Sequence, residues 1–425
     1  MAEPQEKLAA SLERLRALQQ GGRRVFRSKE LGRIHRERLL KQGFLREVMK
    51  GWLIASSPGA HPEDSTPWFA SFWEFCARYC NERFGNGWHL SPEQSLLLHT
   101  ERTAVPTQVI IYSPKGANNL IHLLFGTSLY DLKHEAVLPR TDIVVRDGLR
   151  LYSPIAALMK VPVAFYTRYP VEAQVALTGI RDPSDVLSRL LDGGHSVVAG
   201  RLAGAIRRIG RTDMADEMVS TMKAAGYDVR ETDPFEPGRV LDVIGPSVSP
   251  IVGRLRAMWQ SYRDVVLDNF TRAPGLPKDR KGYLRFIDDI YPTDAYHSLS
   301  IEGYVVTSEL VERVRSGAWD PEHHGTDRDS RDALAARGYW QAFQLVKSSV
   351  AAIIAGENAG QLVRTAHQKW YRELFQPYVA AGLMKASVLA GYRRDAVFLR
   401  TSRHVPPRWE TVRAAMPVFF DLLVH

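Results

Sequence analysis

Cysteine is scarce in this chain of 425 residues, and long apolar runs are absent. Two cysteines cannot build a disulfide framework. No run reaches the roughly 18 apolar residues that a transmembrane helix needs. The first residues form a charged amphipathic pattern without the apolar centre of a signal peptide. These absences predict a cytoplasmic protein that has no membrane partner.

The two cysteines, Cys76 and Cys80, stand four residues apart in an aromatic segment expected to be helical. Both thiols would then share one helix face. A metal site would need two more ligands, for which His61 and His89 are the nearby candidates, but the spacing matches no zinc pattern. The sequence therefore favours two small core residues over a metal site.

Several catalytic motifs are absent as well. No G-x-S-x-G nucleophile elbow occurs. The run Gly85-Asn86-Gly87 lacks the Lys-Ser/Thr pair of a P-loop and the third glycine of a dinucleotide fingerprint, so it predicts a tight turn. The stretch 322–329 contains two adjacent histidines, which suit a polar loop better than a metal site.

Positive charge is present but unevenly distributed. Residues 1–60 carry 13 of the 56 Lys and Arg residues and 6 of the 47 Asp and Glu residues. The remaining 365 residues carry 43 basic and 41 acidic side chains and are nearly neutral. This asymmetry predicts a polyanionic partner for the N-terminal region alone.

The order of elements in residues 1–60 predicts a winged helix-turn-helix. A helix over 6–20 precedes two short helices, SKELG and RIHRERLLKQGF, and a hairpin whose turn is Lys50-Gly51. Leu39 and Leu40 are expected to face inward. The residues expected to face outward and contact duplex DNA are Arg33, Arg36, Arg38, Lys41 and Lys50. A basic surface used for protein contacts is the alternative.

Residues 61–232 alternate between β-type runs and helical periods, which predicts a mixed α/β domain after a linker at 61–67. TQVIIYS, NLIHLLF and TDIVVRDGLRLYSP predict strands, and helices are expected after Ser153. Through the winged module and the stretch DGLRLYSPIAALMKV, residues 5–230 resemble the AbiE-type antitoxin-like regulators. The resemblance implies DNA binding for autoregulation, a protein-contact role for the middle domain and no catalysis.

The Pro/Gly-punctuated stretch 232–239 predicts a boundary, beyond which the region 240–425 is mostly helical. Within it, the segment YHSLSIEGY places Ser298 and Glu302 on one helix face, with Gly303 as a terminator directly behind the acid. An acid at a helix C-terminus is unfavourable for the helix dipole. This slightly favours a functional origin for the glutamate.

The same segment fits the pattern [S/T]-x-x-x-E-[G/N] and resembles the inhibitory helix of the Fic-family AMP transferases. A later stretch, YRRDAVFLRTSRHVPPRWETVRAAM (392–416), resembles the flap hairpin of that family and the helix behind it. The resemblance implies a multidomain α+β chain that ends in an incomplete Fic domain. It also implies that the inhibitory Glu302 pairs with an arginine of the catalytic loop. The flap residues that would dock a target protein are Val397, Phe398, Leu399, Arg400 and His404.

The catalytic loop of that family, HPF-x-[D/E]-GNGR-x-x-R, does not occur in this sequence. His367 precedes the flap and lacks the glycines, so it does not match the family's general base. The resemblance therefore implies no AMP transfer to protein hydroxyls by this chain alone. ATP and Mg²⁺ are expected only where a catalytic segment, a possible partner, is supplied.

Three explanations of the missing loop stay open. The product is truncated or frameshifted, it is a degenerate member kept as a regulator, or it is part of a longer polypeptide. The alternative function is that of a non-catalytic DNA-binding regulator of the antitoxin type.

Overall fold

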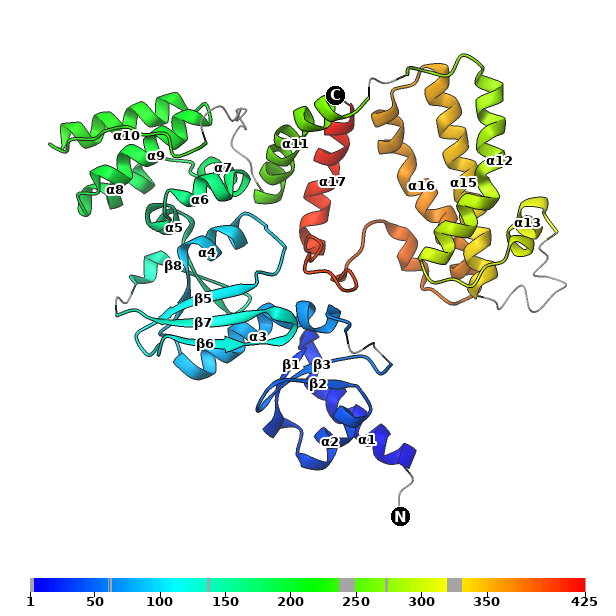
Figure 1. Cartoon of the computed structure of the whole chain (residues 1–425), viewed down its shortest axis with the longest axis horizontal. Coiled ribbons are helices and arrows are strands. Elements are labelled where there is room, and N and C mark those ends of the chain that lie inside the picture. Colours follow the sequence, from blue (N-terminus) through cyan, green and yellow to red (C-terminus); the bar gives the residue numbers. More distant parts are fainter. Residues whose placement is uncertain are drawn as a thin grey trace. The chain divides into compact units, whose positions relative to one another are not determined.

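The computed structural model describes residues 4–59, 61, 63–135, 138–236, 249–271, 274–318 and 331–424. The structure is mixed α/β and mostly helical, with small sheets (Figure 1). Its two compact units are unit 1 (Met1–Tyr262 and Ala396–Arg408) and unit 2 (Arg263–Asp395 and Trp409–His425). The expectation of several domains of mixed class is confirmed at this level. The division falls at 262–263, whereas the sequence placed boundaries near 60 and between 232 and 240.

The N-terminal region contains two helices and a three-stranded antiparallel sheet of order β1-β3-β2. Its elements are α1 (Pro4–Leu18), β1 (Val25–Arg27), the 3₁₀ turn η2 (Ser28–Glu30), α2 (Arg33–Lys41), β2 (Leu45–Met49) and β3 (Trp52–Ala55). The expected first helix and hairpin are present. The segment SKELG forms a 3₁₀ turn and no α-helix, because three residues are too few for one.

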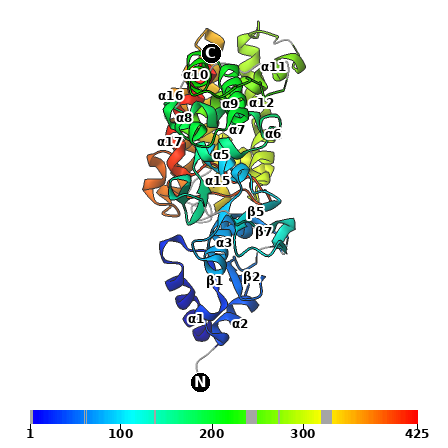
Figure 2. The same cartoon turned by 90° about the vertical axis from the view of Figure 1, so that its left-hand side faces the viewer.

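Successive side chains of this sheet enter two different cores, as the alternation of a strand requires. Phe26 and Leu53 pack with the apolar faces of α1 and α2. Val25 and Ile54 pack with the aromatic helix α3 (Thr66–Phe84). The sheet therefore lies between α1 and α2 on one side and α3 on the other (Figures 1 and 2). Residues 1–60 thus share a hydrophobic core with the residues that follow them.

A second sheet of order β4-β5-β7-β6 follows, in which β5 and β7 are parallel. The elements are β4 (His89–Leu90), α4 (Pro92–His99), β5 (Gln108–Ser113), β6 (Asn119–His122), β7 (Ser128–Lys133) and the hairpin of β8 (Ile143–Arg146) and β9 (Leu149–Tyr152). The strands expected from the β-type runs are therefore present.

Six short helices complete the middle of unit 1 and share one apolar core with α4. They are α5 (Pro154–Lys160), α6 (Ala164–Arg168), α7 (Pro170–Thr178), α8 (Ser184–Asp192), α9 (Ser196–Arg208) and α10 (Thr212–Ala224). A buried carboxylate, Glu172 on α7, accepts hydrogen bonds from Arg102 at 2.7 Å and from Arg254 at 2.8 Å. Arg254 belongs to α11 (Pro250–Asn269), so this ion triplet joins three parts of unit 1.

Unit 2 is a group of helices: α12 (Arg280–Ile301), α13 (Ser308–Ser316), α15 (Arg331–Ala355), α16 (Ala359–Ala380) and α17 (Trp409–Val424). In Figure 1, α12, α15 and α16 run side by side. At Gly338 a Cβ atom would lie 2.0 Å from Leu374 O, so glycine permits the close packing of α15 on α16. Among the described residues, no helix is both long enough and apolar enough to cross a membrane.

Candidate functional site

Helix α2 carries the first candidate site, a basic surface. Arg33 is exposed and its Nε donates to Glu37 Oε1 at 2.8 Å. Arg36 is partly exposed and Lys41 is exposed, and neither forms an ion pair or hydrogen bond within the described residues. Ile34, which is 68% exposed, lies among them. The surface therefore offers two unneutralised cations, and a third that is paired only with its own helix.

Arg38 does not project outward as expected. Its guanidinium donates to Lys7 O at 2.6 Å and to Ser11 Oγ at 2.7 Å, both on α1. Ser11 is fully buried, so Arg38 fastens α2 to α1. The sequence places it at the same spacing as the other basic residues, and only the position of α1 separates its role from theirs.

Lys50 lies exposed at the turn of the β2–β3 hairpin, as expected. Gly51 follows with φ +85°, a left-handed conformation that favours glycine. Arg27 donates to Gly51 O at 3.1 Å and lies over the Trp52 ring at 4.6 Å, which anchors the turn to β1.

The second candidate site is the end of α12. The last helical residue is Ile301, Glu302 caps the helix, and Gly303 follows with φ +83°. Tyr304 N donates to Leu299 O at 3.0 Å, and Gly303 N donates to Ser300 O at 3.0 Å. This is the hydrogen-bond pattern of a Schellman terminus, so the expected helix end at glycine is confirmed.

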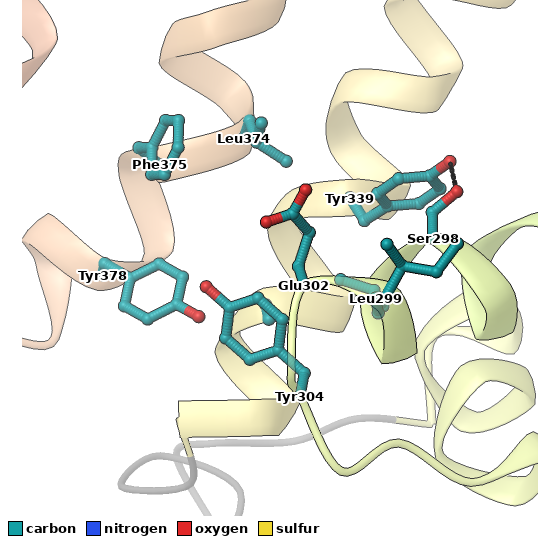
Figure 3. Close-up of a pocket in the computed structure, with 10 residues that line it drawn as sticks. Ser298, Leu299, Glu302, Tyr304, Tyr339, Leu374, Phe375 and Tyr378 are labelled. Atoms are coloured by element: carbon teal, nitrogen blue, oxygen red, sulfur yellow. Dashed lines mark hydrogen bonds between the residues drawn. The ribbon is translucent and has the colours of Figure 1, made fainter. Parts of the chain in front are cut away.

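Glu302 lies at a cavity of about 530 Å³ between α12, α15 and α16. Figure 3 shows its carboxylate directed toward the space between Leu374 and Tyr339. No lysine or arginine is among the described residues that line this cavity, and Glu302 has no ion-pair partner in the described part of the chain. A carboxylate here has free acceptor capacity on both oxygens.

Ser298, one turn earlier, is held in a hydrogen-bonded group. Its Oγ lies 3.2 Å from the hydroxyl of Tyr339, which donates to Asp294 Oδ2 at 2.6 Å. Burial, together with the hydrogen bond to Asp294, raises the pKa of Tyr339 to about 12. The serine is thus bound to α15, whereas Glu302 is left unpaired.

The prediction of a flap hairpin is wrong. Residues 392–408 contain no strand, and their single β-bridge joins His404 to Ala104 in an antiparallel sense. Val105 N donates to Arg403 O at 2.8 Å, and Arg403 Nε donates back to Val105 O at 2.9 Å. The segment pairs with a distant part of unit 1 instead of folding on itself.

The predicted docking residues lie along this segment. Val397 and Leu399 are 43% and 50% exposed, and Arg400 and His404 are also exposed. Phe398 differs, because its ring lies under the guanidinium of Arg24 at 4.7 Å. The helix expected behind Pro406-Pro407 is present as α17.

The remaining candidates have structural roles. Cys76 and Cys80 are fully buried in α3, and burial raises the pKa of both thiols. No cluster of metal-ligating side chains occurs among the residues that the structure describes. His367 lies within α16, where its Nε2 is 3.0 Å from the Tyr392 hydroxyl. The two histidines of 322–329 lie outside the described residues.

Unit 1 contains a cavity of about 580 Å³ that no sequence pattern predicted. It is lined by residues of the α4 N-terminus, the segment before β5, the end of α6 and Arg403. Three arginines and one carboxylate face it: Arg102, Arg168, Arg403 and Glu93. Because these residues are far apart in the sequence, no local pattern identifies them.

Comparisons with protein-family models, with curated proteins and with solved structures find no match for this chain. The function is therefore inferred from the geometry and charge of the sites themselves.

Proposed function

We propose that the N-terminal region binds duplex DNA as a winged helix-turn-helix. The observation that carries the proposal is the exposed face of α2, where Arg36 and Lys41 are unpaired and Arg33 lies beside them. In a winged helix, the corresponding helix enters the major groove and the hairpin contacts the phosphate backbone.

The topology supports this proposal. Two helical segments, η2 and α2, lie between β1 and the β2–β3 hairpin, and the sheet has the order β1-β3-β2. Leu39 of α2 is fully buried in the core with Leu15 of α1, which orients the opposite face of α2 toward solvent. The exposed Lys50 at the hairpin turn is positioned for a phosphate contact.

Charge also favours DNA over a protein partner. Residues 1–60 hold most of the net positive charge of the chain. Lysine and arginine that contact phosphates release counterions, which gives binding a steep dependence on salt. A protein interface of ordinary composition has few charged residues at its centre.

The test compares the full chain with the double variant R36A/K41A by fluorescence anisotropy on a labelled duplex of mixed sequence. We expect the slope of log K against log salt to become shallower by about 2, since each phosphate contact contributes roughly 0.9. Arg38 is left intact because its hydrogen bonds to Lys7 and Ser11 help to hold α2 on α1.

The matched control is R181A/K223A, which removes two exposed charges from the middle of unit 1. It should bind DNA with a salt slope like that of the unaltered protein. Equal slopes for all three proteins would overturn the placement of the DNA-contacting surface.

A second candidate function rests on a separate observation. Glu302 presents an unpaired carboxylate to a cavity at a helix C-terminus, where the dipole gives an acid no support. We propose that unit 2 is a Fic-type regulatory half, in which Glu302 accepts an arginine from a catalytic segment. A bidentate arginine would satisfy both free oxygens of the carboxylate.

The residues around Glu302 do not fit ATP or Mg²⁺ by themselves. The cavity beside Glu302 is lined by Leu299, Tyr304, Leu374, Phe375 and other side chains without positive charge. Phosphates need cationic or backbone donors, and a magnesium ion needs oxygen ligands around it. No nucleotide-dependent step is therefore assigned to this cavity, and AMP transfer from labelled ATP to protein is expected to be undetectable.

A synthetic peptide that contains the motif HPF-x-D-GNGR-x-x-R tests the proposed acceptor role of Glu302. It should bind the full chain, and E302Q should weaken binding about tenfold by removing the charge-assisted pair. A peptide whose arginines are replaced by glutamine serves as the control. Equal binding of the motif peptide to the E302Q variant and to the unaltered protein would count against Glu302 as the acceptor of this arginine.

A further inference from the structure

The arginine-lined cavity of unit 1 has unneutralised positive charge. Arg102 is paired with Glu172, but Arg168 and Arg403 have no carboxylate partner within the described residues. Glu93 is the single acid among the lining residues. Guanidinium groups present planar, forked donors that match the oxygens of phosphate. Nε and Nη2 of Arg403 each donate to Val105 O, so a phosphate would contact the other N–H groups of its guanidinium. Together with the guanidinium of Arg168, they suit the cavity to a phosphate-bearing ligand.

A side-chain amide in the same wall offers a second polar contact to a ligand. Gln94 is only 8% exposed and lines the cavity. Its backbone N donates to Ser91 Oγ, but its side-chain amide forms no hydrogen bond within the described part of the chain. The amide is not one of the fully buried polar atoms that lack a partner, so it is accessible from the cavity. The free amide is thus available to a polar group of a bound molecule.

The size and lining of the cavity indicate the class of ligand. Its volume of about 580 Å³ falls in the range of small-molecule sites. The guanidinium groups of Arg102 and Arg168 lie over the Tyr169 ring, at 5.1 Å and 5.3 Å from its centroid, so an aromatic side chain lies beside the cations. We propose that this cavity binds a phosphate-bearing small molecule of nucleotide size. Arg168 and Arg403 hold the phosphate, and Gln94 hydrogen-bonds the remainder.

The ligand would also hold the segment Ala396–Arg408 in place. Arg403 belongs to that segment, and the other wall residues belong to the first part of unit 1. Without ligand, the attachment beside the cavity consists of backbone bonds, such as Val105 N to Arg403 O and Val405 N to Thr103 O at 3.3 Å, and of the Arg403 guanidinium donating to Val105 O. A phosphate bound by Arg403 and Arg168 adds a bridge between the two parts.

Isothermal titration calorimetry of the full chain with pyrophosphate, AMP and adenosine tests the proposal. We expect pyrophosphate and AMP to bind and adenosine to bind at least about tenfold more weakly, since it lacks the charged group. R168Q should weaken AMP binding by about tenfold or more. The matched control R181Q removes an exposed arginine elsewhere in unit 1 and should leave binding unchanged.

Hydrogen exchange provides a second measurement that does not depend on a variant. Saturating pyrophosphate should slow exchange at Val105 and Val405, whose amides join the segment to unit 1. The DNA-binding variant R36A/K41A should bind AMP normally, so this proposal and the DNA proposal can fail separately. Equal affinity of AMP for R168Q and the unaltered protein would overturn the site, as would equal binding of adenosine and AMP.

Discussion

Unit 1 and unit 2 bury their apolar side chains to different extents. In unit 1, α3 places Trp68, Phe72 and Phe75 at zero exposure, between residues of two sheets. In unit 2, Phe270 and Phe286 remain 76% and 57% exposed. In unit 1, which is more completely packed, the candidate sites consist of charged side chains at the surface of a well-packed core. In unit 2, the candidate residue is an acid, Glu302, that lines a mostly apolar cavity.

Because of this difference in packing, a different kind of observation identifies the site in each unit. On α2, the buried Leu39 fixes the direction of the helix, so the exposed cations can be identified from packing alone. Around Glu302, packing leaves a space, and the missing partner of the carboxylate is the informative feature.

Truncation of an aromatic residue in each unit should give the largest contrast. W68A removes a fully buried indole whose ring centroid lies 5.4 Å from those of Phe72 and Phe75. The indole Nε1 also donates to Thr127 Oγ1 at 3.0 Å. We expect it to lower the unfolding free energy of unit 1 by about 3–5 kcal/mol. F270A, at an exposed site, should change unit 2 by less than about 0.5 kcal/mol.

Hydrogen exchange with peptide resolution would measure both, because it separates the two units. A large loss for F270A would show that Phe270 is covered by a partner in solution, and the contrast in packing would then fail.

Elements with a strong local pattern could be predicted from the sequence. The leucine period of α1, the turn at Lys50-Gly51 and the glycine after Glu302 are short-range signals, and each lies where expected. Where the structure differs from the sequence-based predictions, contacts between distant parts of the chain explain the difference. Residues 392–408 resemble a flap hairpin in sequence, but Arg403 of this segment pairs with the backbone of Val105, almost 300 residues earlier.

The candidate sites follow the same rule. Arg36 and Arg38 are equivalent in the sequence, and they differ only because Ser11 and Lys7 of α1 bind Arg38. The cavity with Arg168 and Arg403 depends on chain segments that meet only in the folded state, so it could not be predicted.

Titration should sharpen the comparison, since unit 1 buries histidines. Burial lowers the pKa of His89 to about 4, and burial also lowers the pKa of His99. The unfolded chain binds these protons near pH 6.5, so the stabilisation is complete above that pH and is lost as pH falls toward 4. Protonation linked to His89 alone should lower the unfolding free energy by roughly 2 kcal/mol at pH 5 and by roughly 3 kcal/mol below pH 4.

Denaturant unfolding between pH 7 and pH 5 would measure this effect. The variant H89F keeps a ring beside Tyr152 but cannot titrate, so its unit 1 should lose less stability on acidification. Identical pH profiles for H89F and the unaltered protein would show that His89 is protonated or solvated in the folded state.

The smallest expected effect lies at the end of α12. A lysine suits a helix C-terminus because its charge opposes the partial negative charge of the free carbonyls. E302K should therefore stabilise unit 2 by about 0.3–1 kcal/mol, whereas G303A should destabilise it by about 1 kcal/mol, because φ at Gly303 is +83°. Thermal unfolding of E302K and G303A would measure both changes in stability. A gain in stability for E302K would mean that this glutamate is held at a cost to the fold, as expected of a residue kept for a partner. A loss of stability for E302K would identify a stabilising contact of the carboxylate. It would remove the main support for the proposal that Glu302 accepts an arginine from a catalytic segment.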